Sequence, residues 1–520
     1  MKENQANELN IEVASRTENS TRNTMVAMIA KMLAIVAGFC TRVIFTRVLS
    51  ESYVGVNGLF TNLLNILNLS ELGISTAIIY GLYKPIAEKD IEKQKSLMQV
   101  YKWFFRGFAT ILFAIGLLLI PFMDILVKTK PEGENIILIY LIYLLNCVMT
   151  YLFIYKKTLI DAYQLSYIGV IYQTVFLVVQ NILQMIVLFT TKNFLLFVLL
   201  LLLCTILNNL AISYKADKMY PFLKDKEVAA LSKEEKKEIA GNVSSMLMLK
   251  ISNVVVNNTA NLVLSAMVGI VSVGLYSNYY LIIGSVRQVL NQMFQGITAS
   301  VGNLGVEESG DRVIKIFNMI FFVCHWLFGL ATICLYELLT PFVEWSFGAK
   351  YVFELNITFV LCLAFYVTGM RQAVLVFKDS FGQFKYDRLK ACIEISINII
   401  ASIVGGYYFG AVGIFAGSII STIAISFWME PYMLYKYNLK APVHKYFVKY
   451  IVYTAVTGIG WYITDMVCNM WEGSAFSQCV VRLFVCVTVP NLIYLVCYFK
   501  SEEFRLLFGK MMGMLKGRSR

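Results

Sequence analysis

The sequence predicts an all-α integral membrane protein of about fourteen transmembrane helices, with two six-helix lobes related by an internal parallel repeat and two further C-terminal helices. Hydrophobic residues make up 58% of the 520 residues and charged residues only 15%, a composition far from that of soluble proteins. Apolar segments of about 20 residues, enough to cross about 30 Å of hydrocarbon, recur along nearly the whole chain. A repeat at a constant offset of 219 residues predicts the two lobes.

Each predicted span is an apolar run bounded by polar or charged residues. The spans cover residues 24–46, 53–80, 97–122, 136–155, 167–190, 193–214, 242–268, 273–301, 316–341, 354–377, 389–409, 411–435, 447–467 and 479–499. The chain is accordingly divided into a cytoplasmic N-terminal tail (1–23), an N-lobe (24–214), a cytoplasmic linker (215–241), a C-lobe (242–435), two additional helices (436–499) and a basic cytoplasmic tail (500–520).

Lysine and arginine predict the orientation, because short cytoplasmic loops are enriched in basic residues. With the N-terminus inside, the cytoplasmic connections and both tails hold 32 basic residues, and the opposite loops hold five. We therefore expect a multi-pass protein of the cytoplasmic (inner) membrane with both termini in the cytoplasm. This bias and contact with anionic lipid explain the net charge of +12, and no nucleic-acid partner is expected.

The internal repeat relates the two halves of the chain. Lys31 and Lys250 each lie inside an apolar stretch, and they are 219 residues apart. The same offset pairs Asn23 with Asn242, Val54-Gly55 with Val273-Gly274, Gln164 with Gln383 and Tyr167 with Tyr386. Spans 1–6 therefore correspond to spans 7–12, and because six is even, both halves begin in the cytoplasm as parallel repeats. Two lobes with a central cleft are expected.

Basic residues inside the spans are candidates for a binding site. A lysine or arginine at membrane depth is costly, so it usually faces a water-filled cavity or a partner. Lys31 and Arg42 are eleven residues apart and lie within about 20° of each other on a helix. Guanidinium and ammonium groups favour an anionic ligand, and phosphate matches them well. The predicted anion-binding residues are Lys31, Arg42, Lys250, Arg287 and Arg371.

Polar side chains follow the same helix faces. In span 2, a stripe within about 120° of arc contains Asn57, Asn68 and Glu71, and in span 7 Asn257 and Asn261 share a stripe with Lys250. We expect the four asparagines to line the cleft. The alternative is that they form hydrogen bonds between packed helices.

Acidic residues in the spans are candidates for coupling or gating. Glu71 and Glu394 can titrate or bind Na⁺, as Glu337 can, and the alternative for each is an ion pair with a neighbouring cation. No cofactor is expected. The sequence contains no Walker-type phosphate loop, so coupling to H⁺ or Na⁺, or the levels of substrate and product, would supply the energy.

An enzyme is not expected. His325 and His444 are isolated, the eleven cysteines have no zinc or disulfide spacing, and no Ser/His/Asp grouping stands out. A membrane glycosyltransferase or polymerase would need a sizeable polar loop, whereas the extracellular loops here are short.

Four segments carry a resemblance to a known family. They are residues 41–49 (TRVIFTRVL), 53–58 (YVGVNG), 69–74 (LSELGI) and 83–87 (YKPIA). In this succession the chain resembles the multidrug/oligosaccharidyl-lipid/polysaccharide exporter (MOP) superfamily, specifically its polysaccharide transporter branch, which includes O-antigen and other lipid-linked oligosaccharide flippases.

The resemblance implies a carrier that moves a polyprenyl-diphosphate-linked oligosaccharide across the membrane by alternating access, for cell-surface polysaccharide biosynthesis. Its expected partners are that glycan, membrane lipid, and a polysaccharide polymerase and glycosyltransferases. A lipid II flippase for peptidoglycan is the nearest alternative. A multidrug or cation antiporter of the same superfamily would place acids rather than bases in its cavity.

Overall fold

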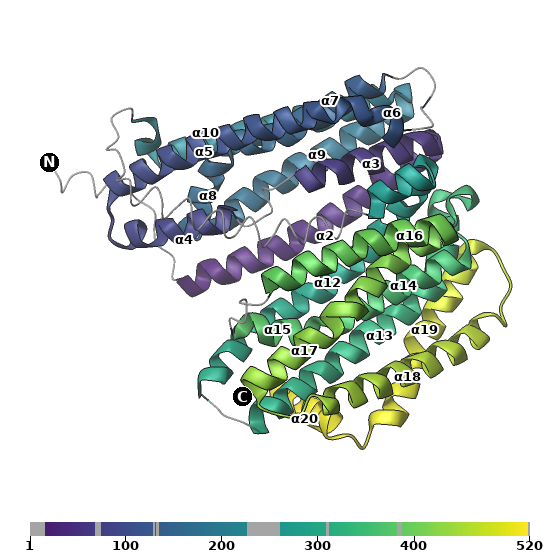
Figure 1. The fold of residues 1–520 in the computed structure, drawn as a ribbon. Helices are drawn as coiled ribbons and strands as arrows, with labels where there is room; N and C mark the ends of the chain where they lie inside the picture. The colour runs from purple at the N-terminus through teal and green to yellow at the C-terminus, as the bar shows by residue number, and fades with distance from the viewer. Residues whose placement is uncertain are drawn as a thin grey trace. The chain divides into compact units, whose positions relative to one another are not determined.

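The computed structural model describes residues 16–67, 74–127, 131, 135–225, 260–307, 311–381 and 387–517. Within these residues all regular secondary structure is helical (Figure 1). Nine of the described helices or helix groups are long and apolar enough to cross a membrane, or ten with the bent pair Ile136–Leu152 and Ile154–Ala162. The chain is therefore a multi-pass membrane protein, which confirms the predicted fold class.

The described helices form two compact units, here called unit 1 and unit 2. Unit 1 is drawn from Met1–Leu49, Leu63–Met123 and Glu132–Ile251, and unit 2 from Ser50–Asn62, Asp124–Pro131 and Ser252–Arg520, as far as these are described. Helices α3 (Glu51–Leu67) and α6 (Met123–Leu126) contribute residues to both. The remaining helices of unit 1 are α2 (Arg16–Val48), α4 (Ile74–Ala87), α5 (Ile91–Leu118), η2 (Ile120–Phe122), α7 (Ile136–Leu152), α8 (Ile154–Ala162), α9 (Ser166–Thr191), α10 (Phe194–Met219) and η3 (Pro221–Lys224).

Among the described elements, unit 2 holds the three longest helices and two π-helical turns. Its elements are α12 (Ile270–Glu307), α13 (Asp311–Phe347), η4 (Ala349–Tyr351), α14 (Leu355–Met370), α15 (Gln372–Ser380), α16 (Asp387–Ser421), the π turn η5 (Thr422–Ser426), α17 (Phe427–Leu434), the π turn η6 (Tyr435–Leu439), α18 (His444–Cys468), α19 (Ala475–Tyr498) and α20 (Glu502–Gly517).

The predicted spans coincide with helices wherever their residues are described. Polar residues between the apolar runs start several of them: Asn135 accepts from the backbone N–H of Leu138 (3.1 Å), and Asn193 accepts from that of Leu196 (2.9 Å). Predicted span 7 (242–268) lies largely outside the described residues, and its residues 260–267 are helical.

Helix α16 reverses direction at Gly410, the point where predicted spans 11 and 12 meet. Gly410 has φ 59° and ψ −136°, a conformation that L-residues rarely adopt. The two arms then pack closely, because a Cβ added to Gly413 would lie 2.0 Å from the carbonyl oxygen of Gly405. The sequence GAVG around this point therefore forms a tight antiparallel helical hairpin, and the predicted boundary is confirmed.

Repeat-related residues meet each other within unit 2. Gly55 of α3 and Gly274 of α12 occupy equivalent repeat positions, and a Cβ on Gly274 would lie 2.9 Å from the backbone nitrogen of Gly55. The contact is reciprocal, since a Cβ on Gly55 would meet the carbonyl oxygen of Ile270 and one on Gly274 that of Glu51. Residues 51 and 270 are also 219 positions apart. The paired glycines thus let two backbones touch at a local pseudo-two-fold axis.

A second repeated residue, Asn23, ties α2 to the start of α9 in unit 1. Its Nδ2 donates to the carbonyl oxygen of Gln164 (2.9 Å), and its Oδ1 accepts from the backbone N–H of Tyr167 (2.8 Å). Asn23, Gln164 and Tyr167 each have a counterpart 219 positions later in the sequence, so the repeat includes residues that contact one another in the fold. Their partners Asn242, Gln383 and Tyr386 lie outside the described residues.

The additional C-terminal helices α18 and α19 pack on α13. The His325 ring stacks on Tyr453 with centroids 4.3 Å apart, and the indole Nε1 of Trp326 donates to Asn491 Oδ1 (2.7 Å). His325 is fully buried, so its place in an aromatic cluster explains this isolated histidine.

Candidate functional site

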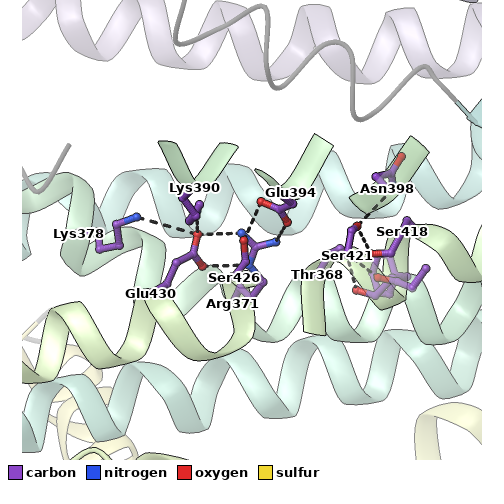
Figure 2. Close-up of polar contacts among 12 residues, drawn as sticks. Thr368, Arg371, Lys378, Lys390, Glu394, Asn398, Ser418, Ser421, Ser426 and Glu430 are labelled. Atoms are coloured by element: carbon purple, nitrogen blue, oxygen red, sulfur yellow. Dashed lines mark hydrogen bonds and ion pairs between the residues drawn. The ribbon is translucent and has the colours of Figure 1, made fainter. Parts of the chain in front are cut away.

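The candidate site of unit 2 is a row of polar contacts, here called the ladder, between the two arms of the hairpin formed by α16 and α17 (Figure 2). Residues four apart on the first arm, from Lys390 to Ser402, contact polar side chains or a backbone carbonyl of the second arm. The contacts are Ser402 with the carbonyl of Ile414 (3.1 Å), Asn398 with Ser421 (3.3 Å), Glu394 with Ser426 (2.7 Å) and Lys390 with Glu430.

Glu430 is the centre of the charged end of this ladder. Its side chain is 1% exposed. Arg371, which follows α14, donates from Nε to Oε2 (3.0 Å) and from Nη2 to Oε1 (2.8 Å). Lys390 Nζ donates to the same Oε1, and Lys378 Nζ of α15 lies 4.0 Å from it. Three cations, from the junction after α14, from α15 and from α16, therefore converge on one carboxylate (Figure 2).

Glu394 is the second carboxylate of the cluster. Its Oε1 accepts from Arg371 Nη1 (3.5 Å), and its Oε2 accepts from the hydroxyl of Ser426 (2.7 Å). The structure thus brings together Arg371 and Glu394, two residues predicted for the site. They form an ion pair, which was the alternative to coupling or gating considered for Glu394. One helical turn further, Asn398 is buried and its Oδ1 has no hydrogen-bond partner within the described structure.

Sequence periodicity missed Glu430 because η5 changes the helical register. On an uninterrupted α-helix, Ser421 and Glu430 are nine residues apart and lie about 180° from each other. The π turn accommodates one extra residue, which returns Ser426 and Glu430 to the face of Ser421. Lys378 and Lys390 were missed for another reason: the predicted limits 354–377 and 389–409 place them at or beyond span ends. The i, i+4 spacing of Lys390, Glu394 and Asn398 was the available signal.

Arg287 of α12 lies in a different electrostatic setting. Its Nη2 donates to the hydroxyl of Thr368 (3.2 Å), and its guanidinium carbon lies 5.6 Å from the centre of the Phe365 ring. Among the described residues it forms no ion pair with a carboxylate. Thr368 lies in the last turn of α14, three residues before Arg371, so this turn links Arg287 to the Glu430 cluster.

The other predicted site residues occupy separate places. Lys31 is exposed on α2, and Arg42 of the same helix is half-buried with its guanidinium 5.9 Å from the Phe45 ring centre. Asn57 is half-buried on α3, and Asn261 is buried with an unpartnered Oδ1 within the described structure. Lys250, Asn68, Asn257 and Glu71 lie outside the described residues.

Glu337, the third acid considered from sequence, is paired with Arg482 of α19. Arg482 Nη1 donates to Glu337 Oε2 (3.1 Å) and to the Glu337 carbonyl (3.2 Å), and Nη2 donates to Asn469 Oδ1 (3.3 Å). Glu337 is fully buried on α13. The pair fixes an additional helix to the body of unit 2. No group of three metal-binding side chains occurs in the described part of the chain.

Comparison with known proteins finds no matching family model and no matching curated protein. Solved structures do match. A lipid II flippase, MurJ, in an inward closed conformation aligns with a TM-score of 0.64 at 14% identity, covering 91% of this chain and 99% of that chain. An inward-facing MATE family multidrug resistance transporter of the MOP superfamily gives 0.58 at 14% identity, covering 77% and 94%. The Vibrio cholerae MATE transporter VcmN in the bent form gives 0.50 at 12% identity, covering 82% and 98%.

The chain has the MOP transporter fold. The likeness extends over nearly the full length of the MurJ chain. At 14% identity the likeness concerns the fold alone.

Proposed function

We propose that this protein is a flippase that moves a polyprenyl-diphosphate-linked oligosaccharide across the cytoplasmic membrane, by alternating access, for cell-surface polysaccharide biosynthesis. The observation that carries the proposal is Arg287, a half-buried guanidinium in a MOP transporter fold that forms no ion pair among the described residues. Because an uncompensated charge at membrane depth is costly, such a group is suited to an anionic substrate.

The diphosphate is the part of this substrate that cannot cross the hydrocarbon layer without the protein, because it is charged. Its charge must be shielded while it crosses the low-dielectric layer, and guanidinium groups match phosphate oxygens in geometry and charge. We assign this role to Arg287, and the sequence makes Lys31, Arg42 and Lys250 further candidates for it. Asparagines 57, 68, 257 and 261 supply amide groups for sugar hydroxyls, while the polyprenyl tail stays in the bilayer.

Two related functions compete with this proposal. The solved structure named as a lipid II flippase shares the fold, and a peptidoglycan precursor carries the same diphosphate chemistry. MATE transporters also share the fold. A function like theirs would give this protein cationic drugs as substrates. The basic residues favour an anionic substrate over a drug cation, whereas the choice of glycan rests on the experiment below.

Coupling to H⁺ or Na⁺ is assigned to Glu394. It shares the ladder with Asn398, whose buried Oδ1 lacks a partner in the described structure, and with the hydroxyls of Ser421 and Ser426. Hard oxygen ligands of this kind suit a monovalent cation, and a carboxylate between helices can also carry a proton. In purified protein, Na⁺ should raise the unfolding midpoint of the wild type and not that of Asn398→Leu. An equal effect on both would remove Na⁺ from this site.

The substrate is tested by extracting lipid-linked intermediates from a deletion strain and identifying the glycan that accumulates. Accumulation of a polyprenyl-diphosphate oligosaccharide is expected, and accumulation of lipid II alone would favour peptidoglycan. Complementation with Arg287→Gln should leave the intermediate elevated despite normal amounts of membrane-inserted protein. Arg505→Gln, which removes an exposed arginine of α20, is the matched control and should restore export. Restored export by Arg287→Gln, or no accumulating intermediate, contradicts the proposal.

A further inference from the structure

Arg371, Lys378 and Lys390 are arranged like the cations of an anion-binding site, and the anion they bind is the carboxylate of Glu430. Arg371 contacts both oxygens of Glu430 through a fork of Nε and Nη2, at 3.0 and 2.8 Å, and Lys390 and Lys378 approach Oε1. A planar guanidinium binds carboxylate and phosphate oxygens with the same two-point geometry, and lysines add charge without demanding a particular direction. The three cations could therefore hold a phosphate group as they hold Glu430.

The helix that carries Glu430 is separated from its neighbours by irregular turns at both ends. Helix α17 has eight residues, with the π turn η5 before it and the π turn η6 after it. It also contains Pro431, which has no N–H for the helical hydrogen bond. A π turn contains one residue more than an α turn, and moving that extra residue past α17 would rotate the segment by about 100°. This rotation would withdraw Glu430 from Arg371 while α14, α15 and α16 stay in place.

The cluster lies near the ends of two apolar spans, where a lipid headgroup can reach it. Arg371 is seven residues from the end of the span Leu355–Lys378, and Lys378 is its last residue. Glu430 is nine residues from the end of Cys392–Leu439. The basic loop count predicts that this end faces the cytoplasm, where a diphosphate-linked precursor would enter. One turn of α14 then connects Arg371 to Thr368 and Arg287.

We propose that Arg371, Lys378 and Lys390 form a diphosphate-binding site whose resident anion is Glu430, and that the substrate diphosphate enters by displacing this carboxylate. The identity of the natural ligand rests on the proposed function, whereas the presence of the anion site does not. Glu430 then acts as an internal substitute for substrate: between transport cycles its carboxylate offsets part of the positive charge of these three cations, and it leaves when a stronger anion arrives.

The test measures binding of inorganic pyrophosphate to the purified full-length protein in detergent, by calorimetry and by the unfolding midpoint. Glu430→Gln removes the resident charge and should bind pyrophosphate at least tenfold more tightly than the wild type. Adding Arg371→Gln to this variant should abolish the gain. If Glu430→Gln binds no more tightly than the wild type, or if the double variant binds equally well, the inference is wrong.

Two additional experiments address whether the variant folds and which anion the site binds. Should Glu430→Gln fail to fold, Glu430→Asp keeps the charge on a shorter side chain and should still bind pyrophosphate more tightly than the wild type, and equal binding would overturn the inference. Polyprenyl diphosphate in the micelle should compete with pyrophosphate, and phosphatidylglycerol should not. Equal competition by both would make the site a general headgroup contact. These binding results are independent of glycan accumulation, so the inference and the proposed function can fail separately.

Discussion

Arg371 forms a bidentate interaction with the carboxylate of Glu430, with Nε donating to Oε2 at 3.0 Å and Nη2 donating to Oε1 at 2.8 Å, although the residues are 59 positions apart in sequence. Burial makes the loss of either partner costly, although Lys390 remains beside Glu430 and Glu394 beside Arg371. Removing one partner of a buried pair costs roughly 3 to 5 kcal/mol, whereas replacing both by apolar residues is often much less harmful.

The first prediction is therefore non-additivity at this pair. Arg371→Met should lower the free energy of unfolding by roughly 3 to 5 kcal/mol, and the double variant Arg371→Met/Glu430→Leu should lose less than the sum of the two single changes. Unfolding in detergent provides the measurement. The pair of exposed Lys350 and half-buried Glu51, 3.5 Å apart, is the control, and Lys350→Met should cost less than about 1 kcal/mol. Simple additivity at Arg371 and Glu430 would contradict the assignment.

The second prediction concerns the reversal of α16. Gly410→Ala should destabilise the protein by about 1 to 3 kcal/mol, because φ 59° with ψ −136° is open only to glycine. No atom lies within 4 Å of the added Cβ, so the cost comes from the backbone alone. Gly458→Ala in α18 has equally open space and helical geometry, and it should be neutral or slightly stabilising. Equal unfolding midpoints for the two variants would be inconsistent with this view.

The third prediction tests the contact of the repeat-related glycines. Gly55→Ala should lower the yield of folded protein and the unfolding midpoint, because its Cβ would lie 2.3 Å from the carbonyl oxygen of Ile270. Gly107→Ala, in α5 with nothing within 4 Å, is the matched control and should be tolerated. Gly274→Ala should behave like Gly55→Ala, because the contact is reciprocal. A tolerated Gly55→Ala alongside a harmful Gly107→Ala would exclude the close contact.

The fourth prediction concerns the attachment of α19. Arg482→Met leaves the fully buried Glu337 carboxylate without its ion pair and should lower the unfolding midpoint clearly. Adding Glu337→Gln should recover part of the loss, because the uncompensated charge is gone. The readout is thermal unfolding in detergent, with Arg505→Gln as an exposed arginine control. No recovery in the double variant would mean that the hydrogen bond of Arg482 to the Glu337 carbonyl dominates.

The lengths and limits of the helices could be read from the sequence because they depend on local properties. Apolar runs of membrane length, asparagine caps at residues 135 and 193, and a glycine turn at 410 each act within a few residues. The repeat offset was also visible, and Asn23 with Gln164 and Tyr167 shows that it marks residues in contact.

The partners of the charged residues depended on the tertiary structure. Regular periodicity places Glu430 about 180° from Ser421, and only the extra residue of the π turn at Thr422–Ser426 brings it to Arg371 and Lys390. Likewise, the sequence placed both Arg287 and Arg371 among the anion-binding candidates. The fold separates them, because Arg371 meets two carboxylates while Arg287 meets a hydroxyl and an aromatic ring. Composition and local pattern thus determined the membrane fold and its basic character, whereas helix register and packing decided which charges are neutralised, because neutralisation requires atoms from distant segments to lie within about 4 Å.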